Sequence, residues 1–297
     1  MNAAQQRAKQ QEIGRILAVL EAASLKDRRR FLWKRVKPKY PRYFYKYRSI
    51  SAQGAQVDPL RGLLIDSAFY LSSPRDFNDP FEFRANVAAY ANVAQRRKKF
   101  SEFLKANQPS LRWKARQQMV TKWLQIPLED WKDRAYQAFN KQGNELGVAS
   151  LSTQPRNVLM WSHYADHHRG VCLQFEVARD PRVFLEAIPI EYSDEFPELN
   201  WFAEDMPNQI RACILRKKTD WRYEEEHRIV RPGSAGSLLP FRPDALSGII
   251  MGANMAAPLQ QRLAALLEER RSLGFAQPII YKASRINYEI ALSRIPF

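Results

Sequence analysis

The sequence contains little cysteine, little glycine and no long apolar run. Its 297 residues include two cysteines, Cys172 and Cys213, and 11 glycines. Two cysteines exclude a disulfide framework, and their spacing is not that of a zinc site. Charged residues interrupt the apolar stretches, which argues against a membrane-spanning helix, a secretory signal and any membrane partner. We therefore expect a cytoplasmic protein in a reducing compartment.

Positive charge is in excess, and it is local. The net charge is +16, yet residues 26–48 hold eleven Lys or Arg against one Asp, and residues 95–145 hold twelve against five acids. The rest of the chain is close to neutral. Charge confined to two segments favours contact with a polyanion over a general role in solubility.

The first basic segment also interleaves aromatic rings with its cations. Rings that stack on bases and cations that bind phosphates are what single-stranded nucleic acids require. Nucleic acid or another polyanion is therefore an expected partner, and a non-enzymatic nucleic-acid-binding module is one open interpretation. The residues expected to bind it are Arg28, Arg29, Arg30, Trp33, Lys34, Arg35, Lys37 and Lys39.

The spacing of apolar residues predicts an α+β fold with a mixed, mainly antiparallel sheet and flanking helices. Residues 1–41 are expected to form a basic N-terminal helical arm, with an amphipathic helix at 3–24. Residues 42–297 are expected to form a single domain with a helical insertion at about 92–145. Strands are expected at 42–50, 147–153, 170–177, 187–193, 221–230, 246–252, 277–283 and 287–292, with a strand and a turn within 67–83, and helices at about 156–167, 208–218 and 256–273.

Three of the four histidines lie in one stretch, LMWSHYADHHRGVCLQF, residues 159–175. On a helix His163 and His167 would share one face, and two imidazoles at that spacing can chelate zinc. The residue after the first histidine is Tyr164, however, where the zincin pattern requires glutamate. We therefore favour no metal, and a helix that carries histidines near its C-terminal end and is stopped by Gly170.

The stretch WRYEEEHRIV, residues 221–230, combines carboxylates with aromatic rings. As a strand it would turn Glu224, Glu226 and Arg228 to one face, and Trp221 and Tyr223 to the opposite face in the core. A solvated face with its own ion pair is the simplest interpretation. A held pair of glutamates can also orient a sugar hydroxyl or stabilise a developing cation.

The chain resembles a bacterial family of unknown function, the domain-of-unknown-function family twenty-nine seventy-one. The resemblance rests on four motifs in this order: YKYRS (45–49), FYLSSPRDFNDPFE (69–82), LMWSHYADHHRGVCLQF (159–175) and WRYEEEHRIV (221–230). It covers about residues 43–292, and the family name implies no activity. The positions that match the family's recurrent residues are His163, His168, Glu224, Glu226 and Arg228.

The order of these parts is also similar to that of ADP-ribosyltransferases, in which an early strand carries Arg, a Ser/Thr strand follows and a late strand carries Glu-x-Glu. The resemblance implies a NAD-dependent transferase in which Glu226 holds the ribose 2′-OH and Arg48 binds the pyrophosphate. Tyr164 or Tyr47 would stack on nicotinamide, and Glu224 would orient the acceptor. The implied catalytic residues are Glu226, Glu224, His163 and Tyr164, and the implied NAD-binding residues are Tyr47, Arg48, Ser150, Ser152, Asn78, Trp161, His168 and Arg228.

A metal-dependent nuclease is a third interpretation, with Asp79, Glu82 or the Glu224 and Glu226 pair as ligands. The three interpretations differ in the ligand that they require: NAD, a polyanion bound in a salt-sensitive way, or a divalent metal. We expect one site, formed where residues 45–48, 78–82, 161–168 and 224–228 converge.

Overall fold

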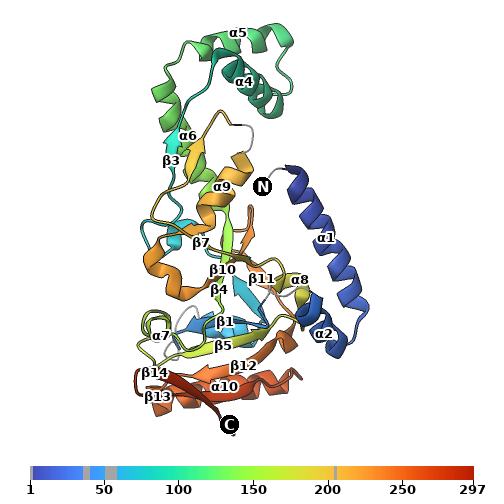
Figure 1. The fold of residues 1–297 in the computed structure, drawn as a ribbon, viewed down its shortest axis with the longest axis vertical. Helices are drawn as coiled ribbons and strands as arrows, with labels where there is room; N and C mark the ends of the chain where they lie inside the picture. Colours follow the sequence, from blue (N-terminus) through green and yellow to red (C-terminus); the bar gives the residue numbers. More distant parts are fainter. Residues whose placement is uncertain (1–2, 36–40, 51–58, 204–205) are drawn as a thin grey trace. The chain divides into compact units, whose positions relative to one another are not determined.

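The structure is a computed structural model that describes residues 3–35, 41–50, 59–203 and 206–297. It divides into two compact units (Figure 1). The first comprises residues 1–72, 147–190 and 220–297, and the second comprises residues 73–146 and 191–219. That residues 42–297 form a single domain stays a prediction. Among the described helices, none combines the length and apolarity needed to cross a bilayer.

The first unit is built on an eight-stranded sheet, which confirms the predicted α+β class. Its strand order is β14-β13-β12-β5-β1-β4-β10-β6, and every neighbouring pair is antiparallel except β12 with β13. The strands are β1 (Tyr43–Arg48), β4 (Gly147–Ser152), β5 (Val171–Glu176), β6 (Ile188–Pro189), β10 (Glu226–Arg231), β12 (Leu246–Met251), β13 (Ile279–Ile286) and β14 (Glu289–Arg294). A two-stranded sheet of β2 (Ala68–Tyr70) and β11 (Leu238–Pro240) accompanies it.

Each face of this sheet has its own apolar core. One face packs Phe44, Phe175 and Ile249 into the larger core, which also takes Leu263 of α10 (Ala257–Ser272) and residues of α3 (Pro59–Leu64) and α8 (Pro181–Phe184). The other face packs a smaller core that includes Tyr47 and residues of α7 (Val158–Tyr164). Because side chains alternate along a strand, β1 contributes to both cores.

The N-terminal arm forms α1 (Ala3–Ala22) and α2 (Leu25–Arg35), close to the helix predicted at 3–24. Arg29 of α2 makes two hydrogen bonds to the buried carboxylate of Glu176 at 2.6 and 2.7 Å, and Arg179 adds a third at 2.8 Å. Burial alone would raise the pKa of Glu176. The hydrogen bonds from the two arginines outweigh burial and lower this pKa from its ordinary value of 4.5.

Arg29→Ala is expected to lower the free energy of unfolding by about 1.5–3 kcal/mol at pH 7, because it removes hydrogen bonds to a charged, buried carboxylate. A lowered carboxyl pKa contributes stability above pH 4.5 and loses it as the pH falls through the folded-state value. The difference between the variant and the parent should therefore shrink at pH 3, measured by urea denaturation. Arg30→Ala, an exposed neighbour, is the control. An equal loss at both pH values would contradict this account.

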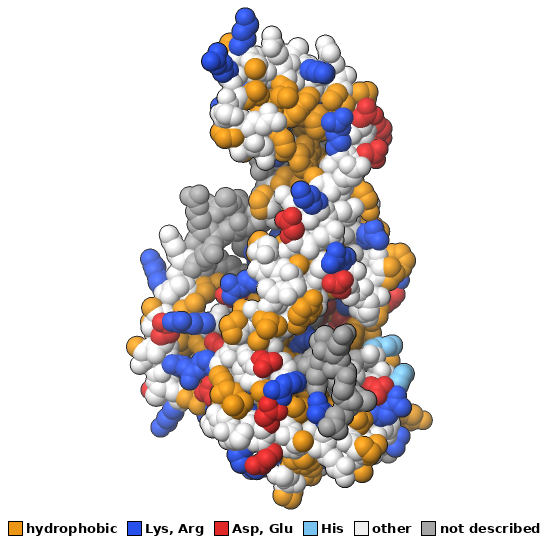
Figure 2. Space-filling view, turned by 180° about the vertical axis from the view of Figure 1, so that it is seen from behind, with side chains coloured by type: hydrophobic (Ala, Val, Ile, Leu, Met, Phe, Trp, Pro, Cys, Tyr) orange, Lys and Arg blue, Asp and Glu red, His pale blue; other side chains and the backbone are white. Residues whose placement is uncertain are grey.

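The second unit contains the predicted helical insertion. Its helices are α4 (Val93–Asn107), α5 (Trp113–Leu124), α6 (Leu128–Glu145) and α9 (Met206–Ile214). Two short parallel pairs accompany them: β3 (Asn86–Ala88) with β8 (Glu198–Asn200), and β7 (Glu191–Tyr192) with β9 (Arg216–Lys217). Aromatic rings form the core, since Phe100 packs against Trp131 and Phe202 at centroid distances of 4.7 and 5.6 Å. In Figure 2, hydrophobic and Lys or Arg side chains lie together on the surface of α4 to α6.

Three expected elements differ from those observed. The predicted strand at 221–230 begins as a 3₁₀ helix, η2 (Thr219–Glu224), and β10 starts only at Glu226. The predicted helix at 156–167 ends at Tyr164, and the predicted strand at 187–193 is split into β6 and β7. The remaining 3₁₀ turns are η1 (Pro74–Asp76) and η3 (Pro243–Ala245). The remaining predicted strands and helices are observed within a few residues of their expected bounds.

The sequence predicted that Gly170 ends a helix, and this is wrong, because α7 already ends at Tyr164. Gly170 instead allows a close approach of two backbone segments. A Cβ atom there would lie 2.2 Å from the carbonyl oxygen of Arg48, at the end of β1. Gly170→Ala should therefore cost about 1–3 kcal/mol of unfolding free energy, the usual range for overpacking. Gly14→Ala, on an open helix surface, should cost nothing and gain up to about 1 kcal/mol. Equal urea midpoints for the two variants would show that the approach is not tight.

Candidate functional site

The first unit brings the predicted Arg, Ser and Glu strands side by side, since β4 lies between β1 and β10. Ser152 of β4 pairs with Tyr45 on one side and with Glu226 on the other. Ser150 pairs with Arg228. Directly paired residues of antiparallel strands point to the same face, so these side chains form a polar patch across three strands.

Helix α7 lies over this face and supplies an aromatic wall. The side chain of Asn157 caps its N-terminus by accepting hydrogen bonds from the amides of Leu159 and Met160. Trp161 is buried edge-on against Tyr47, with ring centroids 5.2 Å apart, and donates its indole N–H to the carbonyl of Pro155. The predicted aromatic residues thus pack on the same face as the serines.

Two buried carboxylates adjoin the serines. Glu226 accepts two hydrogen bonds from Arg228, at 2.7 and 3.0 Å, and the two residues are 5% and 1% exposed. Glu224 accepts a hydrogen bond from the hydroxyl of Tyr164 at 2.6 Å. The hydroxyl of Ser152 donates to the backbone carbonyl of Glu224 at 2.5 Å, which fixes the approach of the chain to β10.

The residue between the two glutamates has an unusual backbone. Glu225 has a φ of 42°, in the left-handed region that side chains other than glycine rarely adopt. Its carboxylate accepts hydrogen bonds from the hydroxyl of Thr153 and the amide of Gln154. Such backbone strain clusters at functional sites, where the surroundings must hold it in place.

Two cations of β1 lie beside this cluster, the buried Lys46 and the half-buried Arg48. They pair with Leu173 and Val171 of the larger core, so their side chains leave β1 on the face opposite to Tyr45 and Tyr47. The ammonium of Lys46 donates to the carbonyl of Ser150 at 2.7 Å, and burial, reinforced by the charge of Arg48, lowers its pKa well below the ordinary value. Burial also lowers the pKa of Arg48 to about 10, so its guanidinium stays charged at neutral pH. Its Nε atom is buried without a hydrogen-bond partner among the described residues. A half-buried, incompletely paired guanidinium is suited to an anionic ligand.

The histidines are arranged differently from the prediction. Because α7 ends at Tyr164, His163 and His167 do not share a helix face, and Asp166, His167 and His168 follow with φ values of 48°, 51° and 68°. His163 and His167 are exposed, and histidine side chains are visible at the surface in Figure 2. Within the described ranges, no group of three or more His, Cys, Asp or Glu side chains is placed to hold a metal ion.

His168 packs against the aromatic wall of α7. Its ring stacks on Trp161 with an interplanar angle of 12°, and its Nε2 atom lies 3.2 Å from the hydroxyl of Ser162. Desolvation, with the charges of Arg285 and His167, lowers its pKa from 6.5. His168 is therefore neutral at neutral pH, which suits contact with an uncharged ring.

Trp221 and Tyr223 were expected on the face opposite to the glutamates, and this is wrong. Both belong to η2, and Tyr223 packs against the smaller core on the α7 side of the sheet. The ring of His163 contacts Trp221 at a centroid distance of 6.3 Å. The residue that faces the larger core is His227, whose ring packs against Phe44 at 5.1 Å. The 3₁₀ turn removes the strand alternation on which the expectation rested.

The stretch 78–82 belongs to the second unit, and its convergence with the other three stretches stays a prediction. Asn78 is exposed, and the Asp79 carboxylate accepts the amide of Phe81 at 2.8 Å. Glu82 forms a buried ion pair with Lys217 at 3.0 Å. The carboxylates of Asp79 and Glu82 thus have protein partners within their own unit.

The residues predicted to bind nucleic acid differ in their exposure and in their hydrogen-bond partners. Arg28 donates to the carbonyls of Ala23 and Glu21, Arg29 holds Glu176, and Arg30 is exposed. Trp33 is half-buried, with the guanidinium of Arg42 4.2 Å from its ring centroid. The side chains of Lys34 and Arg35, and all of Lys37 and Lys39, lie outside what the structure describes.

Lys46 was not predicted as a site residue. In the sequence it lies within a strongly basic run, where lysines are expected to be exposed. The alternation of the strand YFYKYR was the available signal, because a half-buried strand turns every second residue inward. The same alternation places Tyr45 and Tyr47 on one face of β1 and Lys46 on the other.

Residues 160–229 match the model of a family described as "Protein of unknown function (DUF2971)". The match confirms the family resemblance predicted from the sequence motifs, and it spans α7, η2 and the first part of β10. No curated protein and no solved structure was found to match the chain.

Proposed function

We propose, from the geometry of the first unit, that this chain is an ADP-ribosyltransferase-like enzyme with NAD as its substrate. The adjacency of β1, β4 and β10 carries the proposal. It brings an arginine strand, a serine strand and a Glu-x-Glu segment together on one sheet, with Ser152 paired to Glu226. These are the parts, in the chain order, in which the sequence resembles such transferases.

The roles follow from charge and burial. Arg48 is half-buried, and its Nε atom is buried without a hydrogen-bond partner among the described residues, which supports binding of the negatively charged pyrophosphate. Tyr164 and His168 are partly exposed and supply ring surfaces against which nicotinamide would stack, while the fully buried Trp161 supports them from behind. Ser152 acts through its hydrogen bond to the Glu224 carbonyl, and so positions the two glutamates.

NAD supplies a glycosidic bond between the ribose C1′ and a cationic nicotinamide nitrogen. When this bond breaks, nicotinamide leaves with the electron pair, and positive charge develops on the ribose. Glu226 would accept a hydrogen bond from the 2′-OH and stabilise that charge through space. Glu224 would take the proton of the acceptor as the acceptor forms the new bond to C1′. Arg228 and Tyr164 hold the two carboxylates in place.

The cost of the arrangement also supports a functional role. Removing charged groups from water costs several kcal/mol for each ion, and apolar residues of similar size can often replace a buried pair without loss of stability. The first unit buries Lys46, Glu224, Glu226 and Arg228 on neighbouring elements. Buried ionisable groups gathered on neighbouring elements are typical of an active site.

The acceptor is proposed to be nucleic acid or another polyanion, since the excess charge is confined to residues 26–48 and 95–145. The test is incubation of the full chain with NAD, with release of nicotinamide followed by mass spectrometry. Nicotinamide should accumulate, with ADP-ribose appearing on added nucleic acid or, by hydrolysis, free in solution. If NAD stays intact with single-stranded DNA, RNA and water as acceptors, the proposed activity is wrong.

A further inference from the structure

A cavity in the second unit, apart from the candidate site of the first unit, has the chemistry of a ligand site. Its volume is about 210 Å³, and it lies between the segment 81–84, the loop 193–197 and the end of β9. All of its lining residues belong to the second unit. This volume is below the roughly 300–1,000 Å³ of pockets for drug-sized ligands, so it suits one ring system and not a whole dinucleotide.

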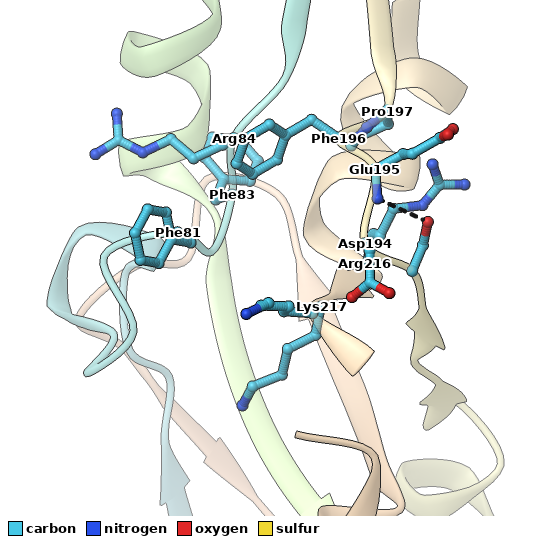
Figure 3. Close-up of a pocket in the computed structure, with 11 residues that line it drawn as sticks. Phe81, Phe83, Arg84, Asp194, Glu195, Phe196, Pro197, Arg216 and Lys217 are labelled. Atoms are coloured by element: carbon cyan, nitrogen blue, oxygen red, sulfur yellow. Dashed lines mark hydrogen bonds between the residues drawn. The ribbon is translucent and has the colours of Figure 1, made fainter. Parts of the chain in front are cut away.

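Aromatic rings form one wall of this cavity. Phe83 is buried and stacked on Phe139 at a centroid distance of 4.4 Å, which makes it a fixed surface. Phe196 and Phe81 are 44% and 63% exposed, and Figure 3 shows the ring of Phe196 directed toward Phe83. Large apolar rings exposed beside a cavity are costly in water unless a ligand covers them.

Cations line the other side of the cavity. Arg216, Lys217 and Lys218 are consecutive, and Figure 3 shows Lys217 apart from the rings of Phe83 and Phe196. The charge of Lys217 is balanced by its buried ion pair with Glu82. Arg216 donates to Glu191 at 2.9 Å, while its Nε atom is buried without a hydrogen-bond partner among the described residues. Lys218 is exposed. Positive charge therefore lies within reach of a group stacked on the rings.

The loop that carries Phe196 is held in shape before any ligand binds. The hydroxyl of Ser193 accepts the amide of Glu195 at 3.1 Å, and the hydroxyl of Thr219 donates to the carboxylate of Asp194. The carboxylates of Asp194 and Glu195 also line the cavity. Carboxylates accept hydrogen bonds from the exocyclic amino groups of bases.

We propose that this cavity binds one unpaired, amino-bearing nucleobase of a single-stranded nucleic acid, with the adjoining phosphates on Lys218 and Arg216. Stacking between Phe83 and Phe196 requires a flat π-face, and the neighbouring cations require an anionic backbone. A paired base is excluded because its faces are covered by its neighbours in the duplex. The proposal rests on the second unit alone and does not require transferase chemistry.

The test is binding of a fluorescein-labelled oligodeoxycytidine to the full chain without NAD, followed by fluorescence anisotropy. An abasic oligomer of equal length, which keeps the phosphates and lacks the bases, is the matched ligand. Phe196→Ala should weaken binding of oligodeoxycytidine about 10-fold and leave the abasic oligomer unaffected, since stacking is lost. Lys218→Ala should weaken both ligands and reduce the salt dependence by about one counterion.

The controls are Phe297→Ala, a phenylalanine that is 49% exposed in the first unit, and Lys122→Ala, an exposed lysine of α5. Neither should change the preference for base-bearing DNA. Equal binding of both oligomers by the parent chain, or an unchanged preference in Phe196→Ala, would overturn the proposal. Nicotinamide release is measured in a separate assay without these oligomers. A negative result in the binding assay therefore does not bear on the proposed transferase activity, and a negative result in the release assay does not bear on base binding.

Discussion

Replacing Glu226 by Gln should reduce nicotinamide release from NAD by about 10²–10³-fold, the usual effect of removing one group that stabilises developing charge. Glutamine keeps the size of the side chain and its capacity to accept a hydrogen bond from Arg228, but it carries no charge. The KM for NAD should change little, since the lost interaction acts mainly on the charge that develops as the bond breaks. Initial rates over a range of NAD concentrations measure both quantities.

Glu289→Gln is the matched control, because Glu289 is an exposed glutamate on β14 of the same sheet. It should retain the parent rate. A Glu226→Gln variant that keeps its circular dichroism spectrum and also keeps its rate would remove Glu226 from the proposed chemistry. If Glu226→Gln loses both its rate and its circular dichroism spectrum, the variant has not folded. Glu224→Gln then serves as the second test of the glutamate pair.

Replacing Arg228 by Met should destabilise the first unit by about 3–5 kcal/mol, because it leaves the buried carboxylate of Glu226 without its partner. Arg228 donates two hydrogen bonds to the carboxylate of Glu226, and both residues are almost fully buried. Urea denaturation at neutral pH, followed by circular dichroism, measures the change in the free energy of unfolding.

The double variant Glu226→Leu/Arg228→Met should recover much of this stability, since apolar residues can replace a buried ion pair without a large penalty. The double variant should nevertheless release no nicotinamide, which separates the stability of the pair from its proposed role. A single Arg228→Met variant as stable as the parent would show that water reaches the pair and that burial does not constrain it.

The strands of the candidate site could be predicted because their residues alternate or form short apolar runs. YFYKYR, GVASLS and VCLQFE were recognised as strands, and the structure places them as neighbours. The carboxylate and guanidinium of Glu226 and Arg228 were also correctly assigned to one face, since they are two residues apart in a strand. Local pattern was enough wherever one element set the direction of its own side chains.

The details between the elements could not be predicted. The three left-handed residues Asp166, His167 and His168 carry no glycine signal, and the turn they form follows a helix that ends early at Tyr164. Likewise, η2 has the composition of a strand, but the hydrogen bonds of Ser152 and Tyr164 to Glu224 hold it as a turn. Tertiary contacts override local preference in both places.

The cavity of the second unit was also invisible in the sequence. Its phenylalanines come from two stretches more than 100 residues apart, and three of its cations, Arg216, Lys217 and Lys218, come from a third. Phe81 and Phe83 belonged to a recognised motif, but only the pairing of β7 with β9 brings Arg216 and Lys217 beside the loop that carries Phe196.

The most direct test of the proposed site is a crystal structure of the Glu226→Gln variant with NAD, in which slow turnover preserves the substrate. We predict electron density for the NAD ribose within hydrogen-bond distance of residue 226, with the pyrophosphate at Arg48 and nicotinamide against the α7 wall. NAD bound elsewhere, or absent at concentrations that saturate other NAD-dependent transferases, would contradict the assignment of β1, β4 and β10 as the active site.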